Sequence, residues 1–183
     1  MVSRAVPAPL AYVPNALTVV RLALIPIFVA LVLGSDSGHS WGAAIVFAGA
    51  GITDQVDGWL ARRWHVESEF GKIADPLADR LMIDAAVILL VVADRLPVVA
   101  LLILARDIAL LAGYKVFVPR GYDFSVSVLG KLATWILYAA IAFVLATPEG
   151  TEWPLWLFWI GLATAVAAGV MYLATAIRDV RSA

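Results

Sequence analysis

Long apolar runs divide the chain into segments of the length that crosses a lipid bilayer. The runs cover approximately residues 15–34, 41–62, 74–93, 97–118, 126–146 and 154–177, with short polar breaks between them. About 20 apolar residues in a helix span the hydrocarbon core of a bilayer, where every backbone polar group must be satisfied internally. With 63% hydrophobic residues and a mean hydropathy of +0.93, the composition excludes an ordinary soluble protein. We expect one all-α integral membrane domain over residues 1–183, with six transmembrane helices in a single bundle and a short interfacial segment at residues 1–13.

The distribution of lysine and arginine indicates how this bundle is oriented. Arg95 is the only lysine or arginine in the first, third and fifth breaks. The other breaks, with their helix ends and the C-terminal tail, contain Arg62, Arg63, Lys72, Arg80, Lys115, Arg120, Lys131, Arg178 and Arg181. Because cytoplasmic loops are rich in basic residues, we expect a multi-pass protein of the cytoplasmic membrane with both termini inside. The opposite edge carries the tryptophans of an interfacial belt, Trp41, Trp153, Trp156 and Trp159. A net charge of −1 offers no basic surface for nucleic acid.

Four aspartates lie at the facing ends of the second and third apolar runs, on the predicted cytoplasmic side. Asp54 and Asp57 are three residues apart and Asp75 and Asp79 are four apart, so each pair shares one face of a helix. If the hairpin folds back, the four carboxylates meet, and such close like charges need a counter-cation. Oxygen ligands suit hard ions, and an open site of this kind suits two Mg²⁺ or Mn²⁺ ions bridging a phosphate. With no cysteine and two histidines in the chain, zinc is not expected. The alternative is structural, with solvated aspartates at a helix end and Asp75 as a helix cap.

The aspartates belong to a longer pattern, D-x2-D-G-x2-A-R-x8-G-x3-D-x3-D, which is complete between Asp54 and Asp79. This pattern resembles the signature of the CDP-alcohol phosphotransferases, integral membrane enzymes of phospholipid synthesis. The resemblance implies a homodimer, a CDP-diacylglycerol donor, an acceptor hydroxyl that attacks the lipid-linked phosphorus, and CMP as the leaving group. It also implies that Asp54, Asp57, Asp75 and Asp79 bind the metal ions, that Asp79 is the base for the acceptor hydroxyl, and that Gly58, Ala61, Arg62 and Gly71 shape the nucleotide site.

A polar stripe opens the first apolar run. Asn15, Thr18 and Arg21 recur every three residues and therefore lie along one side of a helix. Arg21 stands two turns into an apolar segment, where a cation needs an anionic partner. Members of the resembled family carry a similar stripe, so we expect these residues to face the donor phosphates or the aspartates. The alternative is that Asn15 and Thr18 cap the helix while Arg21 extends to the lipid headgroups.

Three further basic residues are candidates for an acceptor site at the cytoplasmic mouth of the bundle, namely Arg106, Lys131 and Arg178. Arg106 and its neighbour Asp107 point about 100° apart on a helix, so each is expected to need a separate partner. A guanidinium with an ammonium nearby suits a phosphate dianion. The predicted acceptor is therefore a phosphorylated polyol, foremost sn-glycerol 3-phosphate, which gives phosphatidylglycerophosphate. Asp84 lies about 140° from the face of Asp75 and Asp79 and is not expected to be a ligand.

Other acceptors and another class of protein remain as alternatives. Residues 15–28, 105–106 and 125–131 are similar to phosphatidylglycerophosphate synthases, whereas residues 106–113 are similar to actinobacterial cardiolipin synthases, for which phosphatidylglycerol is the acceptor. A phosphatidylinositol phosphate synthase is a further possibility within the family. A membrane transporter is the alternative of a different class, but transporters hold their sites near the midplane between repeated halves. Among the glycines, only Gly58 is expected to mark a close approach of helices, and Gly49, Gly51, Gly161 and Gly169 are expected to reflect ordinary membrane-helix composition.

Overall fold

A computed structural model describes residues 13–35, 37–64, 69–117 and 128–182, and all regular secondary structure in these segments is helical. Its elements are α2 (Val13–Leu33), α3 (Trp41–Trp64), α4 (Glu69–Val92), the 3₁₀ turn η1 (Val98–Leu101), α5 (Leu102–Phe117), α6 (Val128–Ala146) and α7 (Trp153–Ser182). The prediction of six helices from the six apolar runs is confirmed, with a 3₁₀ turn before the α-helix in the fourth run, whereas six membrane crossings stay a prediction. The predicted bounds are less accurate, since α4 begins at Glu69 rather than near residue 74 and α7 continues to Ser182. Hydropathy identifies the part of a helix that lipid surrounds, whereas backbone hydrogen bonding continues beyond it.

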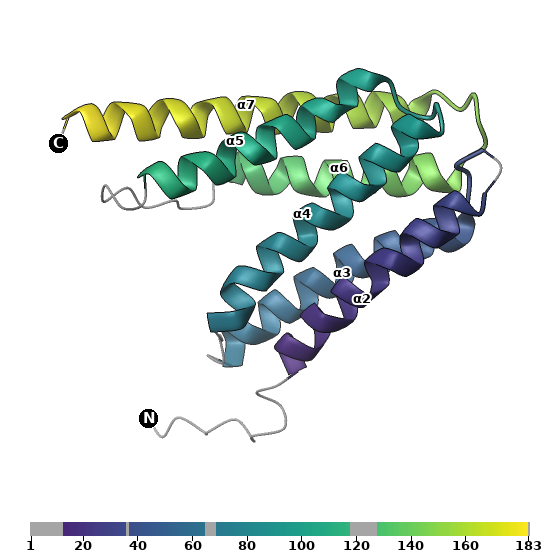
Figure 1. The fold of residues 1–183 in the computed structure, drawn as a ribbon, viewed down its shortest axis with the longest axis horizontal. Helices are drawn as coiled ribbons and strands as arrows, with labels where there is room; N and C mark the ends of the chain where they lie inside the picture. Colours follow the sequence, from purple (N-terminus) through teal and green to yellow (C-terminus); the bar gives the residue numbers. More distant parts are fainter. Residues whose placement is uncertain (1–12, 36, 65–68, 118–127, 183) are drawn as a thin grey trace.

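The helices converge at one end and diverge towards the other (Figure 1). The short connections between α2 and α3, between α4 and η1, and between α6 and α7 gather at the convergent end, which we call the joined end. From there α2, α3 and α4 run in one direction and α5, α6 and α7 in another, so the two groups separate like the arms of a V. Within the arms α2 packs against α3 and α4, and α7 packs against α5 and α6. Contacts between α3 and α6 connect the two arms.

Three of the described helices are long and apolar enough to cross a membrane. They are Ala16–Leu33, Val128–Ala146 and Trp153–Arg178, while Trp41–Thr53 forms a shorter apolar helix. The chain is thus a helical membrane protein by the length and composition of these segments. The other helices are interrupted by charge: α3 and α4 carry the aspartate pattern, and α5 is 16 residues long and contains Arg106 and Asp107.

The core lies where the two arms meet. Phe47 of α3 packs against Phe28 of α2 and Tyr138 of α6, with ring centroids 5.5 and 4.9 Å apart respectively. Gly51 permits this approach, because a Cβ there would lie 2.7 Å from the Tyr138 ring. Gly161 of α7 similarly faces Leu137 of α6. A Cβ atom added to Gly161 would lie 3.0 Å from the leucine side chain. The expectation that these two glycines merely reflect composition is therefore wrong, because small residues here set the helix spacing.

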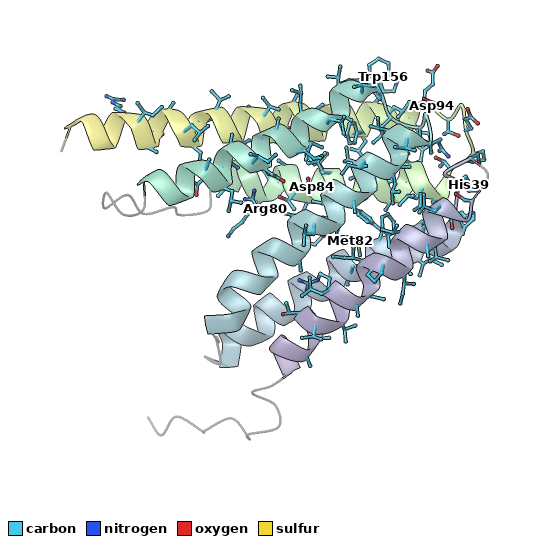
Figure 2. All side chains as sticks on the ribbon, in the orientation of Figure 1. His39, Arg80, Met82, Asp84, Asp94 and Trp156 are labelled. Carbon is cyan, nitrogen blue, oxygen red and sulfur yellow. The ribbon has the colours of Figure 1, made fainter. Side chains whose placement is uncertain are left out.

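Arg95 ties together the connections at the joined end. Its side chain is buried and donates hydrogen bonds to the carbonyl oxygens of Val144 and Thr147 at the end of α6, at 2.6 and 2.8 Å, and to that of Ser37 at 3.3 Å. His39 also contacts the Leu145 carbonyl at 3.0 Å. Burial lowers the pKa of Arg95, and the nearby Glu149 carboxylate acts in the opposite direction. The one arginine of the connections at this end therefore caps a helix instead of facing a phospholipid surface. Figure 2 shows His39 and the exposed Asp94 at this end of the molecule.

Candidate active site

The backbone places the two aspartate pairs at matching positions on adjacent helices. Asp54 and Asp57 lie in the last turns of α3, and Asp75 and Asp79 lie in the first turns of α4, away from the joined end (Figure 1). Asp54 precedes Trp64 by ten residues, and Asp79 follows Glu69 by ten residues, so each lies about 15 Å from the end of its helix. The side chains of the four aspartates are outside the described part of the structure. The backbone register nevertheless fits a site to which both helices contribute carboxylates.

This set of donors fits the predicted divalent ions. Four carboxylates at a common depth provide oxygen ligands only, which is the preference of Mg²⁺ and Mn²⁺. Gly58, Ala61 and Arg62 lie on α3 between Asp57 and the end of the helix, and Gly71 lies in the first turn of α4. Their side chains are also outside the described residues, so their assignment to the nucleotide site stays a prediction.

The described part of the polar stripe of α2 faces the interior. Thr18 and Arg21 are both fully buried, and α2 packs against α3 and α4, the two helices that carry the aspartates. Arg21 follows Val13 by eight residues, which places it about 12 Å from the start of α2 and close to the depth of the aspartate pairs. The alternative in which Arg21 extends to the headgroups is wrong, because such a side chain would be exposed. Asn15 lies in the first turn of α2, and its side chain is not among those described.

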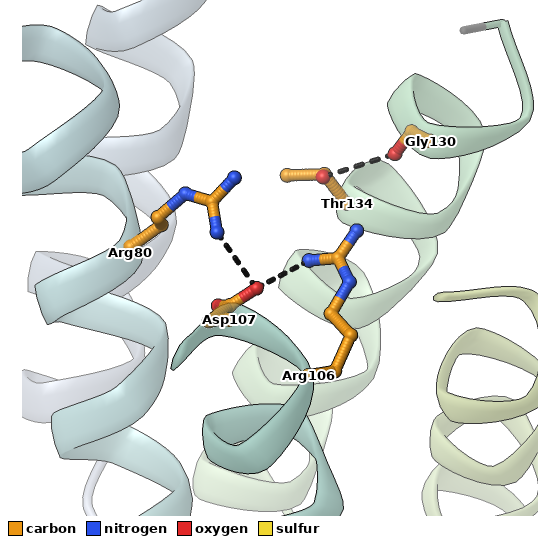
Figure 3. A network of polar contacts seen from close by, with 5 residues as sticks. All are labelled: Arg80, Arg106, Asp107, Gly130 and Thr134. Atoms are coloured by element: carbon orange, nitrogen blue, oxygen red, sulfur yellow. Dashed lines mark hydrogen bonds and ion pairs between the residues drawn. The ribbon is translucent and has the colours of Figure 1, made fainter. Parts of the chain in front are cut away.

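A second polar site links α4 to α5. Asp107 accepts hydrogen bonds at Oδ1 from Arg80 of α4, at 2.9 Å, and from Arg106 of α5, at 2.5 Å (Figure 3). The prediction that Arg106 and Asp107 need separate partners is therefore wrong for this pair. Their Cβ atoms do point apart, but the long arginine side chain bends back far enough to reach the adjacent carboxylate. Arg106 also packs against Gly169 of α7. A Cβ atom added to Gly169 would lie 3.1 Å from the Cγ of Arg106, so this glycine too marks a close approach of two helices.

Asp84 extends this polar group. It lies one turn after Arg80 on the side of α4 that faces α5, where it is within electrostatic range of Asp107, Arg80 and Arg106 (Figure 2). Its Oδ1 is buried and has no hydrogen-bond partner among the described residues. We call Arg80, Asp84, Arg106 and Asp107 the α4–α5 cluster. Sequence reasoning missed Arg80 and Asp107 as parts of one network, because the four-residue spacing of Arg80 and Asp84 indicates only that those two share a face of α4.

The other two candidates for the acceptor site are both exposed. Lys131 is exposed in the first turn of α6, and Arg178 is exposed towards the end of α7. Arg178 follows Gly169, which contacts Arg106, by nine residues and is therefore about 14 Å further along α7. Of the three, only Arg106 belongs to the α4–α5 cluster.

Comparison with known proteins agrees with the aspartate pattern. The family model for CDP-alcohol phosphatidyltransferase matches residues 11–167. A CDP-diacylglycerol–glycerol-3-phosphate 3-phosphatidyltransferase of Bacillus subtilis is 37% identical over 146 residues, which are 72% of this chain and 75% of the relative. A cardiolipin synthase (CMP-forming) of Streptomyces coelicolor is 37% identical over 147 residues, which are 77% of this chain and 67% of the relative.

A third relative covers more of the chain. The CDP-diacylglycerol–glycerol-3-phosphate 3-phosphatidyltransferase of Escherichia coli K12 is 31% identical over 166 residues, 88% of each protein. The region that the family model matches, residues 11–167, contains α3, α4 and α5 in full. It therefore includes both the aspartate pattern and the α4–α5 cluster. On this extent of similarity, the chain belongs to the CDP-alcohol phosphatidyltransferase family.

Proposed function

We propose that this enzyme transfers the phosphatidyl group of CDP-diacylglycerol to sn-glycerol 3-phosphate and releases CMP. The observation that carries the proposal is the complete aspartate pattern, placed at equal depth on α3 and α4 within a chain whose relatives include glycerol-3-phosphate 3-phosphatidyltransferases. The acceptor hydroxyl forms a bond to the lipid-linked phosphorus, the bond from that phosphorus to the bridging oxygen breaks, and the electron pair leaves with CMP. Asp79 accepts the proton of the hydroxyl.

Asp54, Asp57, Asp75 and Asp79 would hold two divalent ions, Mg²⁺ or Mn²⁺. When bound, such ions neutralise the pyrophosphate and stabilise the leaving phosphate. Gly58, Ala61, Arg62 and Gly71 would border the nucleotide, since glycine lets a ligand approach the backbone and arginine binds phosphate. Buried Arg21, at nearly the same depth, would direct its charge towards the same anions, with Thr18 and Asn15 beside it.

The proposed orientation places all six helices across the cytoplasmic membrane, with both termini and the aspartates on the cytoplasmic side. Supporting observations are the concentration of basic residues away from the joined end and the exposure of Trp41, Trp153 and Trp156 at that end. A soluble polyol phosphate would then reach the site from the cytoplasm, while the donor lipid would enter laterally. A homodimer is proposed from the family resemblance.

Cardiolipin synthesis is the second candidate, and one observation favours it. The Streptomyces relative named for that activity is as similar, at 37% identity, as the Bacillus relative. In addition, the α4–α5 cluster weakens the earlier reason for choosing a phosphate dianion. Arg106 has an anionic partner in Asp107, so its burial alone does not require a phosphorylated acceptor.

A panel of acceptors distinguishes these reactions. Purified protein in lipid vesicles is given CDP-diacylglycerol, Mg²⁺ or Mn²⁺, and one acceptor at a time, and released CMP is measured. The proposal predicts rapid release with glycerol 3-phosphate and slow release with phosphatidylglycerol, inositol or inositol phosphate. Rapid release with phosphatidylglycerol alone would assign the enzyme to cardiolipin synthesis, and absence of release with every acceptor would contradict a transferase altogether.

A further inference from the structure

Two guanidinium groups converge on one carboxylate between α4 and α5. Arg80 and Arg106 each donate from Nη1 to the same oxygen of Asp107, whose side chain is only 9% exposed (Figure 3). Like charges this close repel each other, and Asp107 offsets that repulsion by lying between them. A guanidinium has five N–H donors, and the bond to Asp107 uses one from each arginine. The remaining donors of both side chains are therefore held near the same point.

The α4–α5 cluster is open on the side of Arg80. The Arg80 side chain is 41% exposed, whereas that of Arg106 is 19% exposed. The Nε of Arg106 is buried and makes no hydrogen bond within the described part of the chain. That N–H lies beside Gly169 of α7, on the side of Arg106 away from Arg80 (Figure 3). An anion entering past Arg80 would meet the other free N–H donors of the two guanidinium groups, which the bonds to Asp107 leave unused.

We propose that Arg80 binds the anionic group of the acceptor together with Arg106, and that Asp107 is the positioning residue that holds the two guanidiniums together. This inference rests on the proposed function, since it assigns residues to the acceptor end of that reaction. Arg80 directly follows Asp79, the proposed base, along α4. The same turn of helix thus carries the group that accepts the proton and a group that binds the far end of the same molecule.

The charges of the α4–α5 cluster decide which substitution is informative. With Asp84 included, two cations stand beside two carboxylates, so the cluster has no excess positive charge when all four are ionised. Anion binding must then depend on the direction of the arginine N–H groups rather than on net charge. Lysine keeps the charge of Arg80 but not its planar fork of donors. Arg80→Lys is therefore expected to behave like Arg80→Gln, which removes the charge as well.

The kinetic test varies glycerol 3-phosphate at saturating CDP-diacylglycerol and measures CMP release. Arg80→Gln and Arg80→Lys should each raise the KM for the acceptor at least tenfold while changing the KM for the donor less than threefold. Asp107→Asn should raise the acceptor KM similarly, and Asp107→Glu should recover most of the loss. Glu152→Gln, which removes an exposed charge near the joined end, is the matched control and should leave both constants unchanged.

A binding measurement separates this inference from the proposed reaction. Inorganic phosphate should raise the Tm of the purified wild-type protein, and Arg80→Gln and Arg80→Lys should abolish that rise when each variant is compared with its own Tm in the absence of phosphate. If wild type fails to use glycerol 3-phosphate, the proposed function is wrong, yet a rise in Tm that depends on Arg80 would still support the anion site. If either Arg80 variant lowers kcat at an unchanged acceptor KM, or retains the phosphate-dependent rise, the inference is overturned.

Discussion

Replacing Arg95 by alanine tests how the joined end is held together. Arg95 Nη2 donates two short hydrogen bonds, to the carbonyl oxygens of Val144 and Thr147. These bonds cap the C-terminal end of α6 and connect it to the turn after α4. Hydrogen bonds from a charged group contribute about 1.5–3 kcal/mol each. In the alanine variant, part of the lost stability is offset because folding no longer has to bury the guanidinium charge. We therefore expect Arg95→Ala to lower the free energy of unfolding by about 3 kcal/mol, counting nothing for the longer bond to Ser37.

The loss should appear as a clear shift in thermal stability. For a chain of this size, 1 kcal/mol corresponds to about 2–4 °C, so the expected decrease in Tm is about 6–12 °C. The intrinsic fluorescence of the seven tryptophans reports unfolding in detergent, with all variants scanned at the same rate because membrane proteins often unfold irreversibly.

The adjacent residue provides the control for this experiment. Asp94 is exposed and has a φ of 55°, a conformation that asparagine also tolerates, so Asp94→Asn removes a charge without removing a cap. Its Tm should remain within about 2 °C of wild type. If Arg95→Ala matched this control, the hydrogen bonds of Arg95 would not stabilise the joined end and the reasoning would be refuted.

Three further predictions concern the topology, the metal site and the packing of the two arms. In a chain without native cysteine, Glu149→Cys should react with an impermeant thiol reagent only from outside the cell and Arg178→Cys only from the cytoplasm; the reverse pattern would invert the proposed orientation. Each of Asp54→Asn, Asp57→Asn and Asp75→Asn should abolish CMP release and weaken Mn²⁺ binding measured by calorimetry. Asp79→Asn should stop turnover but leave CDP-diacylglycerol binding largely intact, and more than about a tenth of wild-type turnover would exclude Asp79 as the base. Gly51→Ala should lower stability by about 1–3 kcal/mol, because the added methyl meets the Tyr138 ring at 2.7 Å, whereas Gly49→Ala meets no atom within 4 Å and serves as its control.

Much of the architecture was predictable because bilayer thickness imposes a length on apolar segments. Each apolar run contains one α-helix, the fourth preceded by a 3₁₀ turn, and Thr18 and Arg21 of the α2 stripe are both fully buried. The helix ends were not predictable from hydropathy. Glu69 and Lys72 were placed in a connection on polarity alone, yet they belong to the first turns of α4, because a helix can extend past the hydrocarbon core.

What sequence reasoning could not supply was the relation between residues on different helices. The contact of Arg80 with Asp107 joins residues 27 positions apart, and no local spacing indicates which faces of α4 and α5 meet. The glycines show the same limitation: Gly49 and Gly51 are two residues apart, but only Gly51 faces an aromatic ring of another helix. The aspartate pattern was easier to interpret, since all four carboxylates lie on two helices joined by a short connection and their spacing alone predicts that they meet.

The most direct test of the central claim is the stoichiometry of a single transfer. Purified enzyme in vesicles is supplied with CDP-diacylglycerol, Mg²⁺ and radiolabelled glycerol 3-phosphate, and both CMP and labelled lipid are quantified over time. Phosphatidyl transfer predicts one CMP for each labelled lipid formed, with both products absent in Asp57→Asn and in the presence of a chelator. CMP release without labelled lipid, or labelled lipid that still forms in Asp57→Asn, would contradict the assignment of this chain as a glycerol-3-phosphate phosphatidyltransferase that acts through its aspartate pattern.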